Sequence, residues 1–201
     1  MYIPPKYQNS DLDEVRDFLQ ANAFGILVSQ GTDRPFATHI PLELHQTPEG
    51  ADILVGHVAK ANPHWKTFES HPEVLAIFNG PHAYISSSWY KDEEVPTWNY
   101  IAVHVLGTLK VLSEEDLLAS LHKLVNKYEK HSENPLHLDD LSSRTMRQIN
   151  GIVGFSIEIK EIQAAYKLSQ GREEDHPRIT EELRKRATGM DDSVADVMDQ
   201  S

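Results

Sequence analysis

Cysteine is absent from this chain of 201 residues, which excludes disulfide frameworks, thiolate metal sites, iron–sulfur clusters and cysteine nucleophiles. No stretch approaches the roughly 18 consecutive apolar residues of a membrane-spanning helix. The first residues also lack the charged region and the apolar run of a secretory signal. We therefore expect a cytoplasmic protein with no membrane association.

Positive charge is scarce, with 19 Lys and Arg residues against 31 Asp and Glu, for a net charge of −12. Proteins that bind nucleic acids usually carry a basic patch, because neutralising phosphates supplies most of their affinity. The one dense basic cluster here, Arg184-Lys185-Arg186, is flanked by acidic residues. We therefore expect weak or no direct affinity for DNA, so that any contact with DNA is indirect.

Motifs for several common chemistries are also missing. The sequence contains no G-x-G-x-x-G, no phosphate-binding G-x-x-x-x-G-K-[ST] and no G-x-S-x-G nucleophile motif. Histidine is plentiful, with 11 residues, but no His-Glu-x-x-His spacing occurs. We therefore predict no metal site, and we assign no catalytic residue.

Apolar and polar residues alternate in several segments, which is the periodicity of β-strands. The predicted strands cover residues 26–29, 35–44, 53–59, 74–78, 82–90, 98–112 and 153–159, with a turn at 79–81. Predicted helices follow Ser10, which can cap the first, and cover 114–128, 141–149 and 180–187. About seven strands, few helices and no β–α–β rhythm predict a mainly β (α+β) fold, an antiparallel barrel with peripheral helices.

The organisation along the chain predicts one main domain and a short appendage. Residues 1–170 carry all the predicted strands, with inserted helices at about 113–149. Beyond Gly171 the sequence is charged, so residues 171–201 are predicted to form a partly helical C-terminal appendage with a disordered end.

Two regions are candidates for contact with a ligand. His57 shares the apolar face of Ile53 and Val55, where an imidazole costs free energy unless it finds a hydrogen bond. A backbone or carboxylate partner is the simpler interpretation, and the edge of a ligand site is the alternative. The segment Gly80–Tyr100 is dense in aromatic rings, hydroxyls and amides, which suits a flat polar ligand. Packing in the core or in a dimer interface explains those side chains equally well.

Eight short blocks, in order along the chain, resemble one known family. They are Met1-Tyr2-Ile3-Pro4, Thr38-His39-Ile40-Pro41-Leu42, Gly56-His57, Asn62-Pro63-His64-Trp65, Gly80-Pro81-His82-Ala83-Tyr84-Ile85-Ser86, Val95-Pro96-Thr97-Trp98-Asn99-Tyr100, Gly151-Ile152-Val153-Gly154-Phe155 and Lys167-Leu168-Ser169-Gln170. Together they are similar to the PaiB family, the FMN-binding negative transcriptional regulators of bacterial sporulation and protease genes. The blocks that begin at Gly80 and Val95 are the most specific, and the resemblance extends from residue 1 to about residue 172.

The resemblance implies an FMN-binding split β-barrel like that of pyridoxamine-phosphate oxidases, in a homodimer with the cofactor at the subunit interface. The positions that it implies on the phosphate side are Thr38, His39, His57, Lys60, Asn62 and Trp65. Lys60 is the cation that would make a charge-assisted contact there. The positions implied on the ring side, from the second subunit, are Trp98, Asn99 and Tyr100, and those expected to close the site are Lys167, Gln170 and Arg172. The family usually has Asn where this chain has Gly171, so any side-chain role at that position is lost.

Three functional hypotheses follow. The first is an FMN-binding regulator of PaiB type, a repressor implicated in transcriptional control of protease and sporulation genes, without a dedicated DNA-binding domain. The alternative is an FMN-dependent oxidoreductase, an oxidase or reductase, in which the flavin performs the redox chemistry on a small molecule. The third is a haem-handling protein, because related split barrels bind haem and this chain is rich in histidine.

Overall fold

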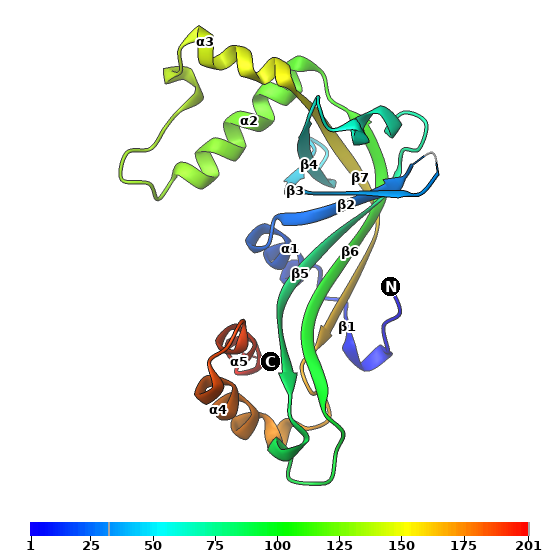
Figure 1. The fold of residues 1–201 in the computed structure, drawn as a ribbon, viewed down its shortest axis with the longest axis vertical. Helices are drawn as coiled ribbons and strands as arrows, with labels where there is room; N and C mark the ends of the chain where they lie inside the picture. Colours follow the sequence, from blue (N-terminus) through cyan, green and yellow to red (C-terminus); the bar gives the residue numbers. More distant parts are fainter. Residues whose placement is uncertain (32, 201) are drawn as a thin grey trace. The chain divides into compact units, whose positions relative to one another are not determined.

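The computed structural model describes residues 1–31 and 33–200 (Figure 1). Its strands are β1 (Gln8–Asn9), β2 (Phe24–Gln30), β3 (Pro35–Gln46), β4 (Asp52–Ala59), β5 (Glu73–Ile85), β6 (Thr97–Val111) and β7 (Ile152–Lys167). They form a seven-stranded sheet in the order β1-β7-β4-β3-β2-β5-β6, and β6 also pairs with β7. Strands β2 to β7 therefore make a closed ring, which confirms the predicted mainly β, antiparallel barrel.

Short helices interrupt and follow the strands. The α-helices are α1 (Leu12–Ala21), α2 (Glu114–Glu129), α3 (Ser143–Met146), α4 (His176–Arg186) and α5 (Asp191–Met198). The 3-10 helices are η1 (Pro5–Tyr7), η2 (Pro63–Thr67), η3 (Ser87–Trp89), η4 (Leu138–Asp140), η5 (Arg147–Gly151) and η6 (Glu173–Asp175). The predicted helix at 141–149 is thus a single α-helical turn followed by a 3-10 segment. Within the described ranges, none of these helices has the length and apolar content needed to cross a bilayer.

The chain divides into two compact units, which are described separately. The first unit comprises residues 1–18, 78–104 and 163–201, and the second unit comprises residues 19–77 and 105–162. Strands β5, β6 and β7 each contribute residues to both units. The predicted boundary between residues 170 and 171 falls inside the first unit and stays a prediction.

The core of the second unit follows from the alternation along its strands. Leu27 on β2, Leu42 on β3 and Leu54 on β4 are fully buried, as are Phe155 and Ile157 on β7. Antiparallel pairing of β2 with β3, β3 with β4, and β4 with β7 brings these side chains into one core. Burial of this face fixes the register, because a shift by one residue would turn the whole set to solvent.

Helix α2 begins where the sequence predicts, and it belongs to the second unit. The Ser113 hydroxyl accepts the backbone N–H of Asp116 at 3.1 Å, which satisfies one of the free donors at the start of the helix. Leu117 and Leu121 lie one turn apart and are buried against Leu138. The cap and this apolar stripe together set where the helix starts and which face it buries.

Gly107 marks a close approach of β6 to β7 within the second unit. A Cβ at this position would lie 2.3 Å from the carbonyl oxygen of Glu158 and 2.6 Å from Cγ2 of Ile157. Only glycine lets the two strands come this close, because any side chain would push the neighbouring backbone away. The N–H of Leu112 donates to the carbonyl of Gly154 at 2.9 Å and adds to the same closure.

The first unit ends in two helices, α4 and α5, where the sequence predicts one helix and a disordered end. Leu183 of α4 and Val194 and Met198 of α5 are buried. Arg186 donates to Asp191 through Nε at 2.7 Å, which ties the end of α4 to the start of α5. The charged residues of this region pair with one another, so a short apolar stripe is enough to fold the segment.

The predicted turn at residues 79–81 is wrong, because β5 runs without interruption through them. A Cβ on Gly80 would lie 2.6 Å from Cε2 of Phe18 on α1, so glycine makes room for that ring instead of forming a turn. The strand count still agrees with the prediction through two opposite differences. The strands predicted at 74–78 and 82–90 are one strand, β5, which lowers the count by one. The strand β1, which was not predicted, pairs with Ala164 and Ala165 on β7 and raises the count by one.

Candidate functional site

The second unit contains a buried polar group that we call the His64 cluster: Ser29, Thr38, Asn62 and His64. His64 is fully buried on η2, and its ring stacks on Phe36 with 4.6 Å between centroids. Its Nε2 lies 2.8 Å from the Ser29 hydroxyl and its Nδ1 lies 2.8 Å from the Thr38 hydroxyl. Both ring nitrogens are therefore hydrogen-bonded, and burial lowers the pKa of His64, which keeps the imidazole neutral.

Asn62 connects this cluster to the backbone of η2. Its side-chain oxygen accepts the N–H of His64 at 3.0 Å, and its amide nitrogen donates to the Thr38 hydroxyl at 3.2 Å. Asn62 is the N-cap of η2, with Pro63 at the first helical position. Thr38 and Asn62, two of the predicted phosphate-side residues, thus meet in the structure, and their polar atoms hold η2 against β3.

Lys60 and Trp65 lie together beside a cavity of about 330 Å³ in the second unit. The indole N–H of Trp65 donates to the carbonyl of Lys60 at 2.9 Å, and the N–H of Lys60 donates to the carbonyl of Gly151 at 2.8 Å. These bonds fix the backbone and leave the ammonium of Lys60 exposed. Lys66 and Glu69 line the same cavity, and Lys66 is a cation that the sequence analysis missed.

The two remaining phosphate-side predictions lie elsewhere in the second unit. His39 is exposed on β3, opposite Ile26 of β2. His57 is half-buried on β4 opposite Gly154, and burial lowers the pKa of its imidazole. It lines a narrow crevice with Glu43 and not the cavity beside Lys60. A role for either imidazole in holding a phosphate stays a prediction.

The first unit contains a larger cleft, of about 540 Å³, which we call the Lys167 cleft. Three segments that are far apart in the sequence line it. They contribute Lys6 and Tyr7; Tyr90, Glu94, Val95, Thr97 and Asn99; and Lys167, Ser169, Gln170, Gly171 and Arg172. The second and third segments carry the Val95–Tyr100 and Lys167–Gln170 blocks of the family resemblance, and the first begins two residues after the block at residues 1–4. The fold therefore brings these blocks to one place.

Lys167 is half-buried at the end of β7, and its ammonium has only neutral partners among the contacts that the structure describes. It donates to the carbonyl of Trp98 at 3.0 Å and to the hydroxyl of Thr97. The ring of Tyr7 lies 5.8 Å from the same ammonium. The positive charge of Lys167 thus faces the cleft without a carboxylate beside it.

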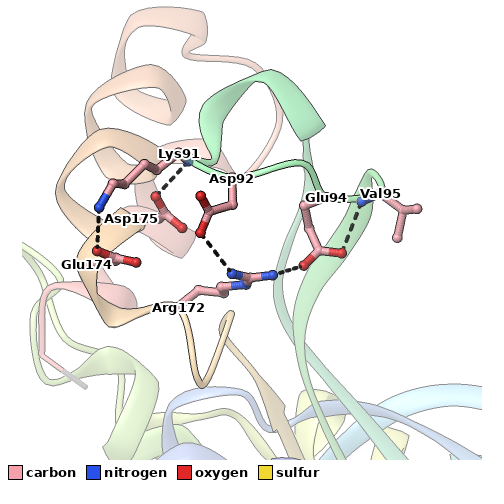
Figure 2. Close-up of polar contacts among 7 residues, drawn as sticks. All are labelled: Lys91, Asp92, Glu94, Val95, Arg172, Glu174 and Asp175. Carbon is pink, nitrogen blue, oxygen red and sulfur yellow. Dashed lines mark hydrogen bonds and ion pairs between the residues drawn. The ribbon is translucent and has the colours of Figure 1, made fainter.

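Arg172 differs from Lys167, because acidic residues surround it (Figure 2). Its guanidinium donates to Glu94 at 2.5 Å and lies 3.9 Å from Asp92. Glu94 also accepts the N–H of Val95 at 3.1 Å, and these two contacts hold the pKa of its carboxyl below the usual value. The carboxylate in turn raises the pKa of Arg172.

A small neutral network forms the floor of the Lys167 cleft. Ser169 is buried with a φ of 64°, a left-handed conformation that is uncommon for residues other than glycine. The amide of Asn99 donates to the Ser169 hydroxyl at 3.0 Å, and the Tyr90 hydroxyl lies 3.2 Å from the same oxygen. Gln170 is held by the carbonyl of Tyr166, to which it donates at 2.6 Å. Asn99 and Gln170 therefore fix the shape of the loop that carries Lys167 and Arg172.

The remaining ring-side residues lie on the surface of the first unit. Trp98 is 53% exposed, and its ring centroid lies 6.2 Å from that of Tyr84 and 6.1 Å from that of His82. Tyr100 is half-buried on the same strand. We call Trp98, Tyr84 and His82 the aromatic patch, since they place three rings side by side on β5 and β6.

The structure thus gathers the predicted residues into two groups, one in each unit, with His39 and His57 apart from the cavity beside Lys60. The sequence analysis missed Ser169 as a member of the first-unit group, although the Lys-Leu-Ser-Gln block contains it. It also missed Lys6 and Glu94, for which no sequence signal exists. No three His, Cys, Asp or Glu side chains of residues 1–31 and 33–200 are placed to hold a metal ion.

Comparison with known proteins adds the family. A family model described as "Putative FMN-binding domain" matches residues 1–161. The Bacillus subtilis "Protease synthase and sporulation protein PAI 2" is 43% identical over 201 residues, with 99% of this chain and 97% of that protein covered. An uncharacterized Aspergillus fumigatus protein is 28% identical over 222 residues, with 85% of each chain covered.

Two solved structures share the fold. The FAD and haem binding protein of Mycobacterium smegmatis matches with a TM-score of 0.63 at 13% identity, over 80% of this chain and 73% of that chain. The flavocytochrome Anf3 of Azotobacter vinelandii matches with a TM-score of 0.58 at 19% identity, over 80% and 69% of the two chains. The expected split β-barrel is confirmed, and the chain belongs to the FMN-binding domain family, with the PaiB-type protein of B. subtilis among its relatives.

Proposed function

We propose that this protein is an FMN-binding regulator of PaiB type that acts as a homodimer in negative control of protease and sporulation genes. The observation that carries the proposal is the match to an FMN-binding family over residues 1–161, together with a relative of nearly equal length that is 43% identical. The name of that relative refers to protease synthesis and sporulation.

The donor set in the second unit fits the phosphate of FMN. A phosphate needs a cation and several hydrogen-bond donors. Lys60 and Lys66 supply ammonium groups beside the 330 Å³ cavity, and the indole of Trp65 supplies an apolar wall. Thr38 and Asn62 act as positioning residues, because their polar atoms hold η2. The exposed His39 and the half-buried His57 are further candidates on β3 and β4.

The aromatic patch of the first unit suits an isoalloxazine ring. Trp98 and Tyr100 would contact the ring. Asn99 and Gln170 would fix the loop that carries Lys167 and Arg172, and this loop would close over the ring. When bound, FMN supplies reversible redox chemistry, while the protein residues bind and orient it. The exposed rings of Trp98 and Tyr84 also favour a subunit interface, since aromatic residues are enriched there.

Regulation through direct contact with DNA is disfavoured by the pairing of the basic cluster. Arg184 contacts Asp196 at 2.9 Å and Asp199 at 2.8 Å, and Lys185 contacts Glu181 at 2.8 Å. Acidic neighbours within the first unit thus offset these charges, which reduces the positive potential available to attract phosphates. We therefore propose that the protein acts on gene expression through another partner.

Titration with FMN tests the cofactor. Purified protein is expected to bind FMN with a stoichiometry of one per chain and to run at a mass near twice 22.8 kDa. Lys60→Met should weaken FMN more than riboflavin, which lacks the phosphate. Lys110→Met is the matched control, because Lys110 does not itself line this cavity and its ammonium pairs with Glu158 on the surface. An equal loss of FMN affinity in both variants would show that Lys60 does not contact the phosphate.

Three further measurements separate the regulator from the other hypotheses. A tight, salt-sensitive shift of promoter DNA by the purified protein would contradict indirect regulation. The open Lys167 cleft favours the oxidoreductase as a second candidate, because its volume suits a small substrate. Bleaching of bound flavin by NADH or NADPH would favour a reductase, and a Soret band after haem addition would favour haem handling.

A further inference from the structure

We propose that the Lys167 cleft binds a small molecule through a carboxylate or phosphate group, with the ammonium of Lys167 as the first contact. The proposal concerns the first unit alone and does not depend on how the second unit holds a flavin phosphate. The chemistry of the ligand follows from the charges that line the cleft.

Positive charge exceeds negative charge in this cleft, although the whole chain has a net charge of −12. Lys6, Lys167 and Arg172 line it together with one carboxylate, that of Glu94. Asp92 reaches Arg172 from outside the lining at 3.9 Å. A cleft with this balance attracts anions, while most of the surface repels them.

Of these three cations, Lys167 is the one whose ammonium has no described carboxylate partner and is also held by hydrogen bonds. The described ion pairs of Lys91, Lys110, Lys127, Lys160 and Lys185 all join an ammonium to a carboxylate. Lys167 instead donates to the oxygens of Thr97 and Trp98. Those two bonds leave a third N–H and the full charge for a ligand.

Lys6 is the second contact and Arg172 the third. The ammonium of Lys6 lies 4.8 Å from the ring of its neighbour Tyr7, and both residues line the cleft. Arg172 forms an ion pair with Glu94, so part of the guanidinium charge is already offset before a ligand binds. Removing the charge of Glu94 would free the guanidinium and should strengthen anion binding.

The backbone that follows Lys167 has a conformation that is common at ligand sites. Ser169, two residues further on, adopts a left-handed φ of 64°, and Gly171 follows with a φ of 81°. Glycine adopts a positive φ without strain, whereas Ser169 does not, and strained positions of this kind gather at ligand sites, where the surrounding structure holds them. Here Asn99 and Tyr90 hold Ser169, so the loop keeps Lys167 and Arg172 on the cleft.

Inorganic phosphate is the probe for this site. The midpoint of thermal unfolding of the full chain is measured against phosphate concentration at constant ionic strength, because a ligand that binds the folded state raises it. We expect an apparent Kd on the order of 1 mM, the affinity of a single small anion. Lys167→Met should weaken it about tenfold or more, since a charge-assisted hydrogen bond is lost.

Three variants make the result decisive. Glu94→Gln should strengthen phosphate binding about threefold, because one negative charge leaves the cleft. Lys6→Met should weaken phosphate binding less than Lys167→Met does, and it takes the place of Lys167→Met as the test if that variant fails to fold. Lys185→Met removes one charge from the surface of α4 and should leave the affinity unchanged. An unchanged phosphate response in both lysine variants of the cleft, or in Glu94→Gln, overturns the proposal.

The source of the anion is resolved by repeating the titration with FMN at saturation. If phosphate still binds, the cleft takes a separate organic acid or phosphate ester. If FMN blocks phosphate, and Lys167→Met weakens FMN but not riboflavin, the cleft holds the phosphate of the flavin itself. Either outcome supports an anion site, whereas failure to bind FMN at all contradicts only the proposed function.

Discussion

Two lysines show how differently the two units use positive charge. In the second unit, Lys127 of α2 donates to the buried carboxylate of Glu43 at 2.6 Å, and the Tyr128 hydroxyl donates to the other oxygen at 2.7 Å. In the first unit, Lys167 meets only neutral oxygens beside an open cleft. One charge stabilises the fold, and the other is left for a ligand.

The buried polar groups of the two units follow the same contrast. In the His64 cluster both ring nitrogens are hydrogen-bonded, so the cluster is closed to further partners. The network around Ser169 is also neutral, but it forms the floor of a cleft whose rim carries charges. Pairing, more than residue type, therefore separates structural polar groups from candidate functional ones.

The largest effect on stability should come from breaking the Glu43 pair. Lys127→Met leaves a buried carboxylate with Tyr128 as its remaining partner, which should lower the free energy of unfolding by about 3 kcal/mol. Urea denaturation measures the change. Lys110→Met, in an exposed pair, should change it by less than about 1 kcal/mol. Equal effects of the two variants would mean that the Glu43 pair is no more structural than a surface pair.

The closure of the barrel should be almost as sensitive. Gly107→Ala places a methyl group 2.3 Å from the carbonyl oxygen of Glu158, so we expect a loss of about 2 kcal/mol from strain. Gly151→Ala is the matched control, since a Cβ there meets nothing within 4 Å. Thermal unfolding of both variants measures the difference, and an unaltered midpoint in Gly107→Ala would show that β6 and β7 separate without cost.

Lowering the pH should also destabilise the second unit, and the free energy of unfolding should fall gradually over the range in which its histidines titrate. Burial lowers the pKa of His45, His57 and His64, so the unfolded chain binds protons more readily than the folded one. Stability should therefore be intact above about pH 7 and fall as the pH drops through about 6.5, the unfolded value. Each histidine contributes at most about 1.4 kcal/mol per pH unit.

The free energy of unfolding between pH 7.5 and 5.5 measures this slope. His57→Leu should reduce the slope, because it removes one of the groups that titrate. A slope that is the same in the variant and the parent would show that His57 takes up protons equally in the folded and unfolded chains.

The smallest effect on stability should come from the charge in the cleft. Lys167→Met loses hydrogen bonds to two neutral oxygens and should cost about 1 kcal/mol, even though it abolishes most anion binding. Urea denaturation of this variant beside Lys127→Met measures the contrast directly. A cost for Lys167→Met that exceeds the cost for Lys127→Met would reverse the distinction between the two units.

Much of the fold could be predicted from local patterns. The alternation that predicts a strand at 98–112 matches β6, and the helix predicted at 114–128 matches α2. The turn predicted at 79–81 failed because Gly80 serves packing against Phe18, which lies far away in the sequence. A glycine alone does not reveal whether its neighbour is solvent or a ring.

Less of the candidate site could be predicted, because pairing depends on the fold. The resemblance implies that Lys167 and Arg172 both help to close the site, and nothing in the sequence shows which of the two meets a carboxylate. Glu94 neutralises one and not the other across a separation of 78 residues. Likewise, Lys127 and Lys167 each come near the end of a long segment with alternating or helical apolar spacing. Only the position of Glu43 in the fold gives Lys127 a carboxylate partner that Lys167 lacks.

The closed ring of strands β2 to β7 limits how copies of this chain associate. A sheet with a free edge recruits partners by extending its own backbone hydrogen bonds. Here the described pairing of β2 with β5 ends at Ile77, so that route is left to residues 78–85 of β5 and to the two residues of β1. Over the rest of the ring, a contact between copies would have to be made by side chains, which can be substituted one at a time without altering the barrel.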